Sequence, residues 1–95
     1  MKKELITRLH KNFEGFAHHE EGVEFWYARD LQELLEYTEW RNFSQVIEKA
    51  KLACYNAHID LSDHFVDVNK MVDLGSATKR EIPDLKLTRY ACYLI

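Results

Sequence analysis

The chain has 95 residues, of which 46% are hydrophobic and 13% aromatic, so it holds enough apolar material for one core and is not a disordered protein. It contains no run of 18 apolar residues, and the charged start at Lys2–Glu4 is not followed by an apolar signal region. We therefore expect a soluble, cytoplasmic protein without a membrane partner. The two cysteines, Cys54 and Cys92, are too few for a disulfide framework and are expected to be reduced and buried.

The formal net charge is −3, and it is unevenly distributed along the chain. Residues 1–67 carry 8 basic and 13 acidic side chains, whereas residues 68–95 carry 5 basic and 3 acidic ones. A polyanion would therefore meet the C-terminal third of the chain rather than the molecule as a whole.

Residues 1–20 are predicted to contain an N-terminal amphipathic helix, which covers residues 3–18. The apolar side chains that mark its buried stripe are those of Leu5, Ile6, Leu9, Phe13, Phe16 and Ala17. Residues 22–28 follow with an aromatic and β-branched composition, which favours a short strand entered through a turn at Gly22.

Two further helices are predicted in the middle of the chain. Residues 29–37 place three leucines on one face and indicate a short helix. Thr38 is expected to cap a longer helix over residues 40–57, because its hydroxyl can accept a hydrogen bond from a free backbone N–H in the first turn. Arg41 and Lys49 lie on the polar face of this longer helix, which is therefore left to solvent or to a partner.

A β-hairpin is predicted after the longer helix. Its first strand begins at about Val66 or Met71, and the turn is signalled by Gly75–Ser76. Lys79–Leu87 forms the second strand, in which Pro83 has no N–H to donate and therefore marks an edge position or a bulge. The tip, Gly75–Arg80, is expected to project from the body of the domain.

The last eight residues begin another helix, with Thr88 as its cap and apolar residues at helical spacing. No stop signal follows, so we expect the chain to be a fragment of a longer protein, cut inside this helix. The predicted fold class is α+β: a small helical domain with a short strand and a C-terminal β-hairpin, arranged like a winged helix and ending in a truncated helix.

Several strings of the sequence are specific enough to indicate a family. They are Phe25–Tyr37 (FWYARDLQELLEY), Trp40–Phe43, Ala50–Cys54, Asp63–Phe65, Gly75–Ser76 with Lys79–Arg80, and Arg89–Ile95 (RYACYLI). In this order they resemble the N-terminal part of the DNA-damage-inducible protein D family, whose module is similar to the Bro-N domain of viral and phage proteins. The resemblance identifies residues 21–95 as a Bro-N-like domain and leaves the N-terminal helix outside it.

This resemblance implies a bacterial protein of the DNA-damage or SOS response, with an α+β domain that binds DNA. It also implies a second half beyond the last helix. The chain departs from the family pattern at Glu36, where relatives often have a glycine. Glu36 is therefore expected to let the short helix run on and to change the turn at Tyr37–Thr38.

Seven residues are candidates for contact with DNA phosphates, because arginine and lysine supply charge-assisted donors and the Gly75–Ser76 turn can supply backbone N–H groups. They are Arg29, Arg41, Lys49, Ser76, Lys79, Arg80 and Arg89. The alternative is that the cations pair with acids of the same domain, for example Arg29 with Asp30 or Glu33, and Arg80 with Glu81. Only a cluster on one face would favour DNA.

We expect neither a metal, nor a cofactor, nor catalysis. Cys54 and His58 are one helical turn apart, but no close pair of cysteines supports a zinc site with His64 and Cys92. The single glycine–serine pair lacks the surrounding glycines of a nucleophile elbow or a phosphate-binding loop.

Two functions remain open from the sequence. The first is a non-catalytic DNA-binding module that uses residues 40–57 and the hairpin tip. The second is a protein-interaction domain that regulates a DNA-repair or recombination protein, for which an exposed Trp40 or Tyr55 would be an indication. A homodimer is a further candidate assembly, because the unfinished last helix presents an apolar face.

Overall fold

The computed structural model describes residues 3–75 and 77–95 and folds them into helices packed on one antiparallel sheet. This architecture confirms the predicted α+β class, whereas the winged-helix comparison stays a prediction. The helices are α1 (Lys3–Gly15), α2 (Ala28–Leu34), α3 (Trp40–Asn56) and α4 (Arg89–Leu94), with a 3-10 turn η1 (Leu61–Asp63). The strands are β1 (His18–Glu20), β2 (Val23–Tyr27), β3 (Phe65–Asp73) and β4 (Lys79–Leu87).

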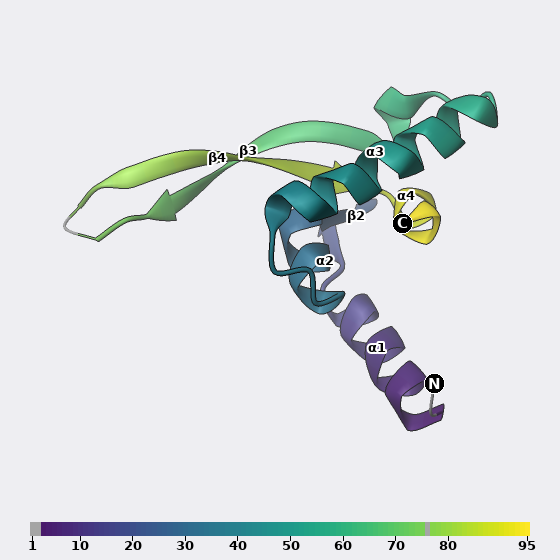
Figure 1. Cartoon of the computed structure of the whole chain (residues 1–95), viewed down its shortest axis with the longest axis horizontal. Coiled ribbons are helices and arrows are strands. Elements are labelled where there is room, and N and C mark those ends of the chain that lie inside the picture. Colours follow the sequence, from purple (N-terminus) through teal and green to yellow (C-terminus); the bar gives the residue numbers. More distant parts are fainter. Residues whose placement is uncertain (1–2, 76) are drawn as a thin grey trace.

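The sheet has the strand order β1-β2-β4-β3, so β4 is a central strand. β3 pairs with β4 over its whole length, from Phe65 opposite Leu87 to Asp73 opposite Lys79. β2, in contrast, pairs with β4 only through Trp26 and Tyr27. The part of the hairpin beyond this short pairing is here called the arm, residues 68–74 and 79–83, and Figure 1 shows it reaching well beyond the helices.

The predicted hairpin is therefore confirmed, and the strand ends next to its turn, Asp73 and Lys79, project from the body. Pro83 lies opposite Asn69 in an unbroken register, so it marks no bulge. Its carbonyl oxygen accepts hydrogen bonds from the side chain of Arg29 and so points away from β3. The N and the C=O of a strand residue point to the same side, so the missing N–H of Pro83 also points away from β3. β2 pairs with β4 only at Lys86 and Leu87, and it does not extend to Pro83. At this position β4 is an edge, although its C-terminal end is central.

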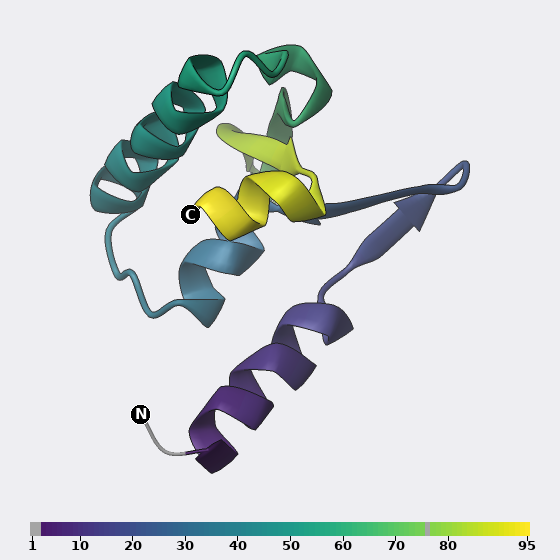
Figure 2. The ribbon, with the colours of Figure 1, turned by 90° about the vertical axis from the view of Figure 1, so that its right-hand side faces the viewer.

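The core lies between α3 and one face of the sheet. Phe43, Ile47, Ala50 and Cys54 form the buried side of α3, as the sequence predicted. Figures 1 and 2 show α4 lying beside α3, while α1 runs outward with its N-terminal end far from the sheet. The other members of the buried cluster are Ala28, Leu31, Phe65, Leu85, Leu87 and Ala91.

The N-terminal segment differs from the prediction. The helix ends at Gly15 instead of residue 18, and His18–Glu20 forms the strand β1, which pairs with β2. The turn between these strands uses Glu21 and Gly22, both at positive φ, so the predicted turn at Gly22 is confirmed. β1 was missed because its three residues are polar and all exposed, and they show no apolar alternation.

The expected extension of the short helix through Glu36 is wrong. α2 ends at Leu34, and Glu36 adopts the left-handed conformation with a φ of 64°. The N–H of Tyr37 donates to the carbonyl of Gln32, and the N–H of Glu36 donates to that of Glu33. This is the Schellman pattern, which glycine forms without steric cost, and the hydrogen bonds and packing hold it here with a glutamate.

The two threonines predicted to cap helices behave differently. Thr88 Oγ1 accepts the N–H of Ala91 at 3.1 Å and lies 2.7 Å from His64 Nδ1, so it caps α4 as predicted. Thr38 does not cap α3: the helix begins one residue later, after Glu39, and no side chain at the cap position accepts a hydrogen bond. The chain before α3 is extended, which moves Thr38 out of reach of the first turn.

We predict that Thr88→Ala lowers the free energy of unfolding by about 1 kcal/mol, because the N-cap bond to Ala91 and the contact with His64 are lost. Thr38→Ala is the matched control and should change it by less than about 0.5 kcal/mol. Urea denaturation followed by circular dichroism measures both values. Equal losses in the two variants would contradict the assignment of the caps.

We also predict that Glu36→Gly raises the free energy of unfolding by about 1 kcal/mol, since glycine adopts the left-handed conformation without a Cβ clash. Glu33→Gly, within α2, is the control and should lower it by about the same amount. The same denaturation series tests both, and a destabilised Glu36→Gly would show that the glutamate side chain stabilises the turn.

Candidate nucleic-acid interface

The structure places the predicted phosphate-binding residues in three different settings. Arg41 and Lys49 are exposed on the outer side of α3, in agreement with the sequence analysis. Arg29 and Arg89 are partly buried at contacts between elements, and Lys79 and Arg80 lie at the outer end of the arm. Ser76 lies outside the described residues.

Arg29 joins α2 to β4 through both its side chain and its backbone N–H. Its Nε and Nη2 both donate to the carbonyl oxygen of Pro83, at 3.0 and 2.9 Å, and its guanidinium carbon lies 3.8 Å from the centre of the Trp40 ring. Burial lowers the pKa of Arg29, and the charge of Asp84 partly opposes that effect. The guanidinium therefore joins β4 to the start of α3, and its partners are not the neighbouring acids that the sequence suggested.

Asp84 completes this contact from the other side. It is 1% exposed, and its Oδ1 accepts the backbone N–H of Arg29 at 3.0 Å and that of Leu85 at 2.8 Å. Tyr27, at the cap position of α2, supplies no side-chain cap, so Asp84 satisfies a free N–H of this helix from a distant strand. A carboxylate at this position is also favoured by the positive end of the helix dipole.

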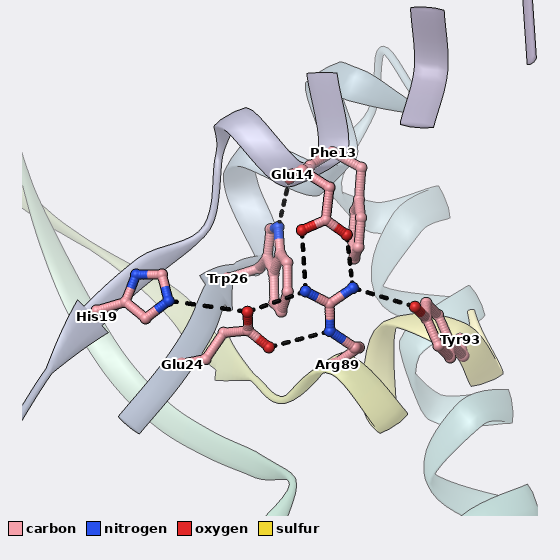
Figure 3. Close-up of polar contacts among 7 residues, drawn as sticks. All are labelled: Phe13, Glu14, His19, Glu24, Trp26, Arg89 and Tyr93. Atoms are coloured by element: carbon pink, nitrogen blue, oxygen red, sulfur yellow. Dashed lines mark hydrogen bonds and ion pairs between the residues drawn. The ribbon is translucent and has the colours of Figure 1, made fainter. Parts of the chain in front are cut away.

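Arg89 binds two carboxylates at once. As Figure 3 shows, its guanidinium donates to Glu14 of α1 and to Glu24 of β2, and its Nη1 also donates to the hydroxyl of Tyr93. These hydrogen bonds hold the pKa of Glu14 and of Glu24 below the ordinary value and raise that of Arg89. His19 Nε2 lies 3.8 Å from the Glu24 carboxylate.

The same contact fastens α1 to the body. Phe13 stacks on Trp26 with ring centres 4.4 Å apart, and the Trp26 Nε1–H donates to the Phe13 carbonyl at 2.7 Å, beside the Arg89 ion pairs (Figure 3). Arg89 therefore serves as a structural cation that joins α1, β2 and α4, with its donors already occupied.

Lys79 and Arg80 are neighbours in sequence but lie on opposite faces of the arm. Arg80 is directly opposite Val72, whereas Lys79 is opposite Asp73. Residues that face each other across two strands share one side of a sheet, so the cross-strand neighbour of Lys79 is an acid and that of Arg80 is a valine.

One face of the arm therefore gathers cations and apolar residues. This basic face of the arm consists of Lys70, Val72, Arg80 and Ile82, because Lys70 is opposite Ile82. The acids Asp73 and Glu81 lie on the other face. Sequence reasoning missed Lys70. Alternation divides each strand into two faces, but only the pairing register shows which residues of β3 share a face with Arg80 of β4.

Among the residues that the structure describes, the body beside the arm offers no comparable surface. Lys86, on the same side of the sheet, pairs with Glu20 at 3.1 Å and lies 4.7 Å from the Phe25 ring centre. Its charge is therefore balanced. The cations that remain exposed near the sheet are those of the arm, and Arg41 and Lys49 form a second exposed set on α3.

Both cysteines are free. Cys54 is buried and its Sγ lies 3.6 Å from the carbonyl of Ile59, while burial raises the pKa of Cys92 to about 12 and keeps it a thiol. Within residues 3–75 and 77–95, no three His, Cys, Asp or Glu side chains gather as metal ligands. In the same part of the chain, no helix has the length and apolar character needed to cross a membrane.

The chain thus has an α+β fold with a projecting β-ribbon, and its sequence contains the family-specific strings described above. Residues 16–95 match the family described as BRO family, N-terminal domain, and the chain belongs to this family. It is 47% identical over 74 residues to the DNA damage-inducible protein D of Escherichia coli (strain K12), which confirms the predicted resemblance. The aligned part is 78% of this chain but only 27% of that relative. No solved structure matches the chain.

The Arg89 ion pairs predict a pH dependence of stability. Glu14 and Glu24 have a lower pKa in the folded chain than in the unfolded one, so the stabilisation is present above the unfolded pKa and is lost as the pH falls from there through the lowered folded pKa. In Arg89→Met this loss should be smaller, which flattens the curve of stability against pH. Urea denaturation between neutral and acid pH measures it.

Arg80→Met is the matched control, because it removes one arginine from an exposed position on the arm. Its curve should run parallel to that of the unmodified chain. A parallel curve for Arg89→Met as well would contradict the proposed origin of the acid sensitivity.

Proposed function

We propose that this chain is a non-catalytic DNA-binding module of a bacterial protein that acts in the response to DNA damage. The observation that carries the proposal is the basic face of the arm, where Lys70 and Arg80 lie together on a hairpin that projects from the body, with the acids Asp73 and Glu81 on the other face. The family supports it, and the name of the Escherichia coli relative associates that protein with DNA damage.

The geometry suits phosphate contact on an acidic domain. A net charge of −3 would repel DNA from most of the surface. Surface charges are largely screened beyond about 8 Å at physiological ionic strength, so Arg80, near the outer end of the arm, acts with little opposition from the body. Lys70 lies closer to the body and lines a hollow with acids of α2. Two-stranded β-ribbons of this kind enter DNA grooves in several known classes of DNA-binding protein.

α3 supplies a second set of contacts in this proposal. Arg41, Gln45 and Lys49 follow one another at intervals of four residues, which places them on one stripe of the helix. All three are exposed. Because Arg29 and Arg89 are committed to contacts within the domain, we assign the phosphate contacts to the arm first and to this stripe second.

The rival function is a protein-interaction domain that binds a DNA-repair or recombination protein, or a second copy of the chain. Leu52 and Tyr55 on the outer side of α3 favour it, since they are 60% and 68% exposed. Trp40, the other ring singled out by the sequence analysis, is covered by Arg29 and does not contribute. A cytoplasmic location is consistent with either function and is part of the proposal.

Fluorescence anisotropy with labelled DNA over a salt series tests the proposal. Arg80→Ala and Lys70→Ala should each weaken binding and should each reduce the slope of log affinity against log salt by about 1, the value expected for one lost phosphate contact. The double variant Arg41→Ala/Lys49→Ala tests the stripe on α3 in the same way.

Lys11→Ala is the charge-matched control, because this lysine is exposed on α1, away from the arm. It should leave the slope unchanged. If the unmodified chain fails to bind DNA even at low salt, the proposal is wrong and the protein-interaction function becomes the better one.

A further inference from the structure

A cavity lies at the base of the arm. Its volume is about 350 Å³, within the range of pockets that hold small ligands. It opens on the side of the sheet that carries the basic face of the arm, because Lys70 belongs to both. Its walls come from β1, β2, the start of α2 and β3, and they consist of His18, Tyr27, Asp30, Val68, Asn69 and Lys70.

Two aromatic rings form one part of this cavity and are held in place by neighbours. His18 and Tyr27 meet edge to face with ring centres 4.9 Å apart, and each also packs on Phe25, at 5.4 and 5.3 Å. The His18 side chain is still 44% exposed, so a flat ligand can reach it. Fixed rings of this kind stack on nucleobases at little cost in entropy.

Polar groups beside the rings suit the edge of a base. The Asp30 carboxylate accepts hydrogen bonds, and it lies 3.6 Å from His18 Nε2. The exposed amide of Asn69 both donates and accepts. Exocyclic amines, ring nitrogens and carbonyls of a nucleobase match such a set, whereas a phosphate would be repelled by the carboxylate.

The surroundings favour a single strand over a duplex. Asp30 and Lys70 also line an adjoining hollow, together with Glu33 and Glu36 of α2 and the following turn. These acids repel phosphates, and a duplex brings two phosphate backbones to them whereas a single strand brings one. A single strand is narrower, and its unpaired bases are free to leave the backbone and enter a cavity.

We propose that this cavity receives one unstacked base of single-stranded DNA whose phosphates follow Lys70 and Arg80. The inference rests on the proposed function and deepens it, because it names the form of DNA that the arm binds. A perfectly paired duplex offers the same phosphates but no free base, and so it binds through the arm alone.

The test compares the affinities of the chain for a short mixed-sequence single strand and for the matching duplex, by fluorescence anisotropy. Tyr27→Leu should lower the affinity for the single strand about tenfold, in line with the loss of one base–aromatic stacking contact. Tyr27→Phe keeps the ring and should bind the single strand as the unmodified chain does. Tyr55→Leu removes an exposed tyrosine outside the cavity and is the matched control.

Thermal unfolding by circular dichroism shows whether each variant is folded. If Tyr27→Leu is folded and binds the single strand as well as the unmodified chain, the cavity holds no base and this inference is wrong. The proposed function stands in that case, provided that Arg80→Ala still weakens binding. If Arg80→Ala has no effect on either DNA, the proposed function itself fails.

Discussion

The contact between α2 and the Pro83–Asp84 step of β4 holds the arm in a fixed direction. Asp84 accepts a hydrogen bond from the backbone N–H of Arg29 in the first turn of α2, 55 positions earlier in the sequence. The guanidinium of Arg29 in turn donates to the carbonyl of Pro83 and lies over the Trp40 ring. A buried carboxylate is costly unless it is hydrogen-bonded; here Oδ1 accepts two backbone N–H groups beside the positive end of the α2 dipole, whereas Oδ2 is buried without a hydrogen-bond partner among the described residues. The strand that forms half of the arm is therefore fastened to two helices where it leaves the body.

The two partly buried arginines, Arg29 and Arg89, bind groups of the domain itself. Arg89 links α1, β2 and α4 through two glutamates, and Arg29 links α2, α3 and β4. Both residues are drawn away from the surface by partners that are distant in sequence. The sequence therefore contains more cations than the structure leaves exposed on one continuous surface. On the arm, the alternation of side chains along each strand places Lys70 and Arg80 on one face and the acids Asp73 and Glu81 on the other.

Much of the fold was predictable because its signals are local. The apolar face of α3, the hairpin and the Thr88 cap each depend on residues within a few positions of one another. The two errors concern the backbone conformation at helix ends, which apolar periodicity does not reveal. Thr38 fails as a cap because the preceding chain is extended, and Glu36 takes a glycine-like conformation because hydrogen bonds at the end of α2 impose it.

The candidate interface was only partly predictable, because its residues come together through strand pairing and not through closeness in sequence. Arg80 was recognised, but its companion Lys70 is ten residues away and joins it only through the pairing of β3 with β4. The cavity at the base of the arm brings together four elements, and β1 among them carries no apolar pattern that would reveal it. Composition located the basic third of the chain, whereas the register decided which cations share a face.

Pro83 has a consequence for how this protein behaves at high concentration. A long exposed ribbon with an open edge invites other chains to add strands to it and so to aggregate. On the open side of β4, Pro83 presents no N–H, and its carbonyl oxygen is already occupied by Arg29. An incoming strand would find neither donor nor acceptor at this step, so strand addition along the β4 edge of the arm is interrupted at Pro83.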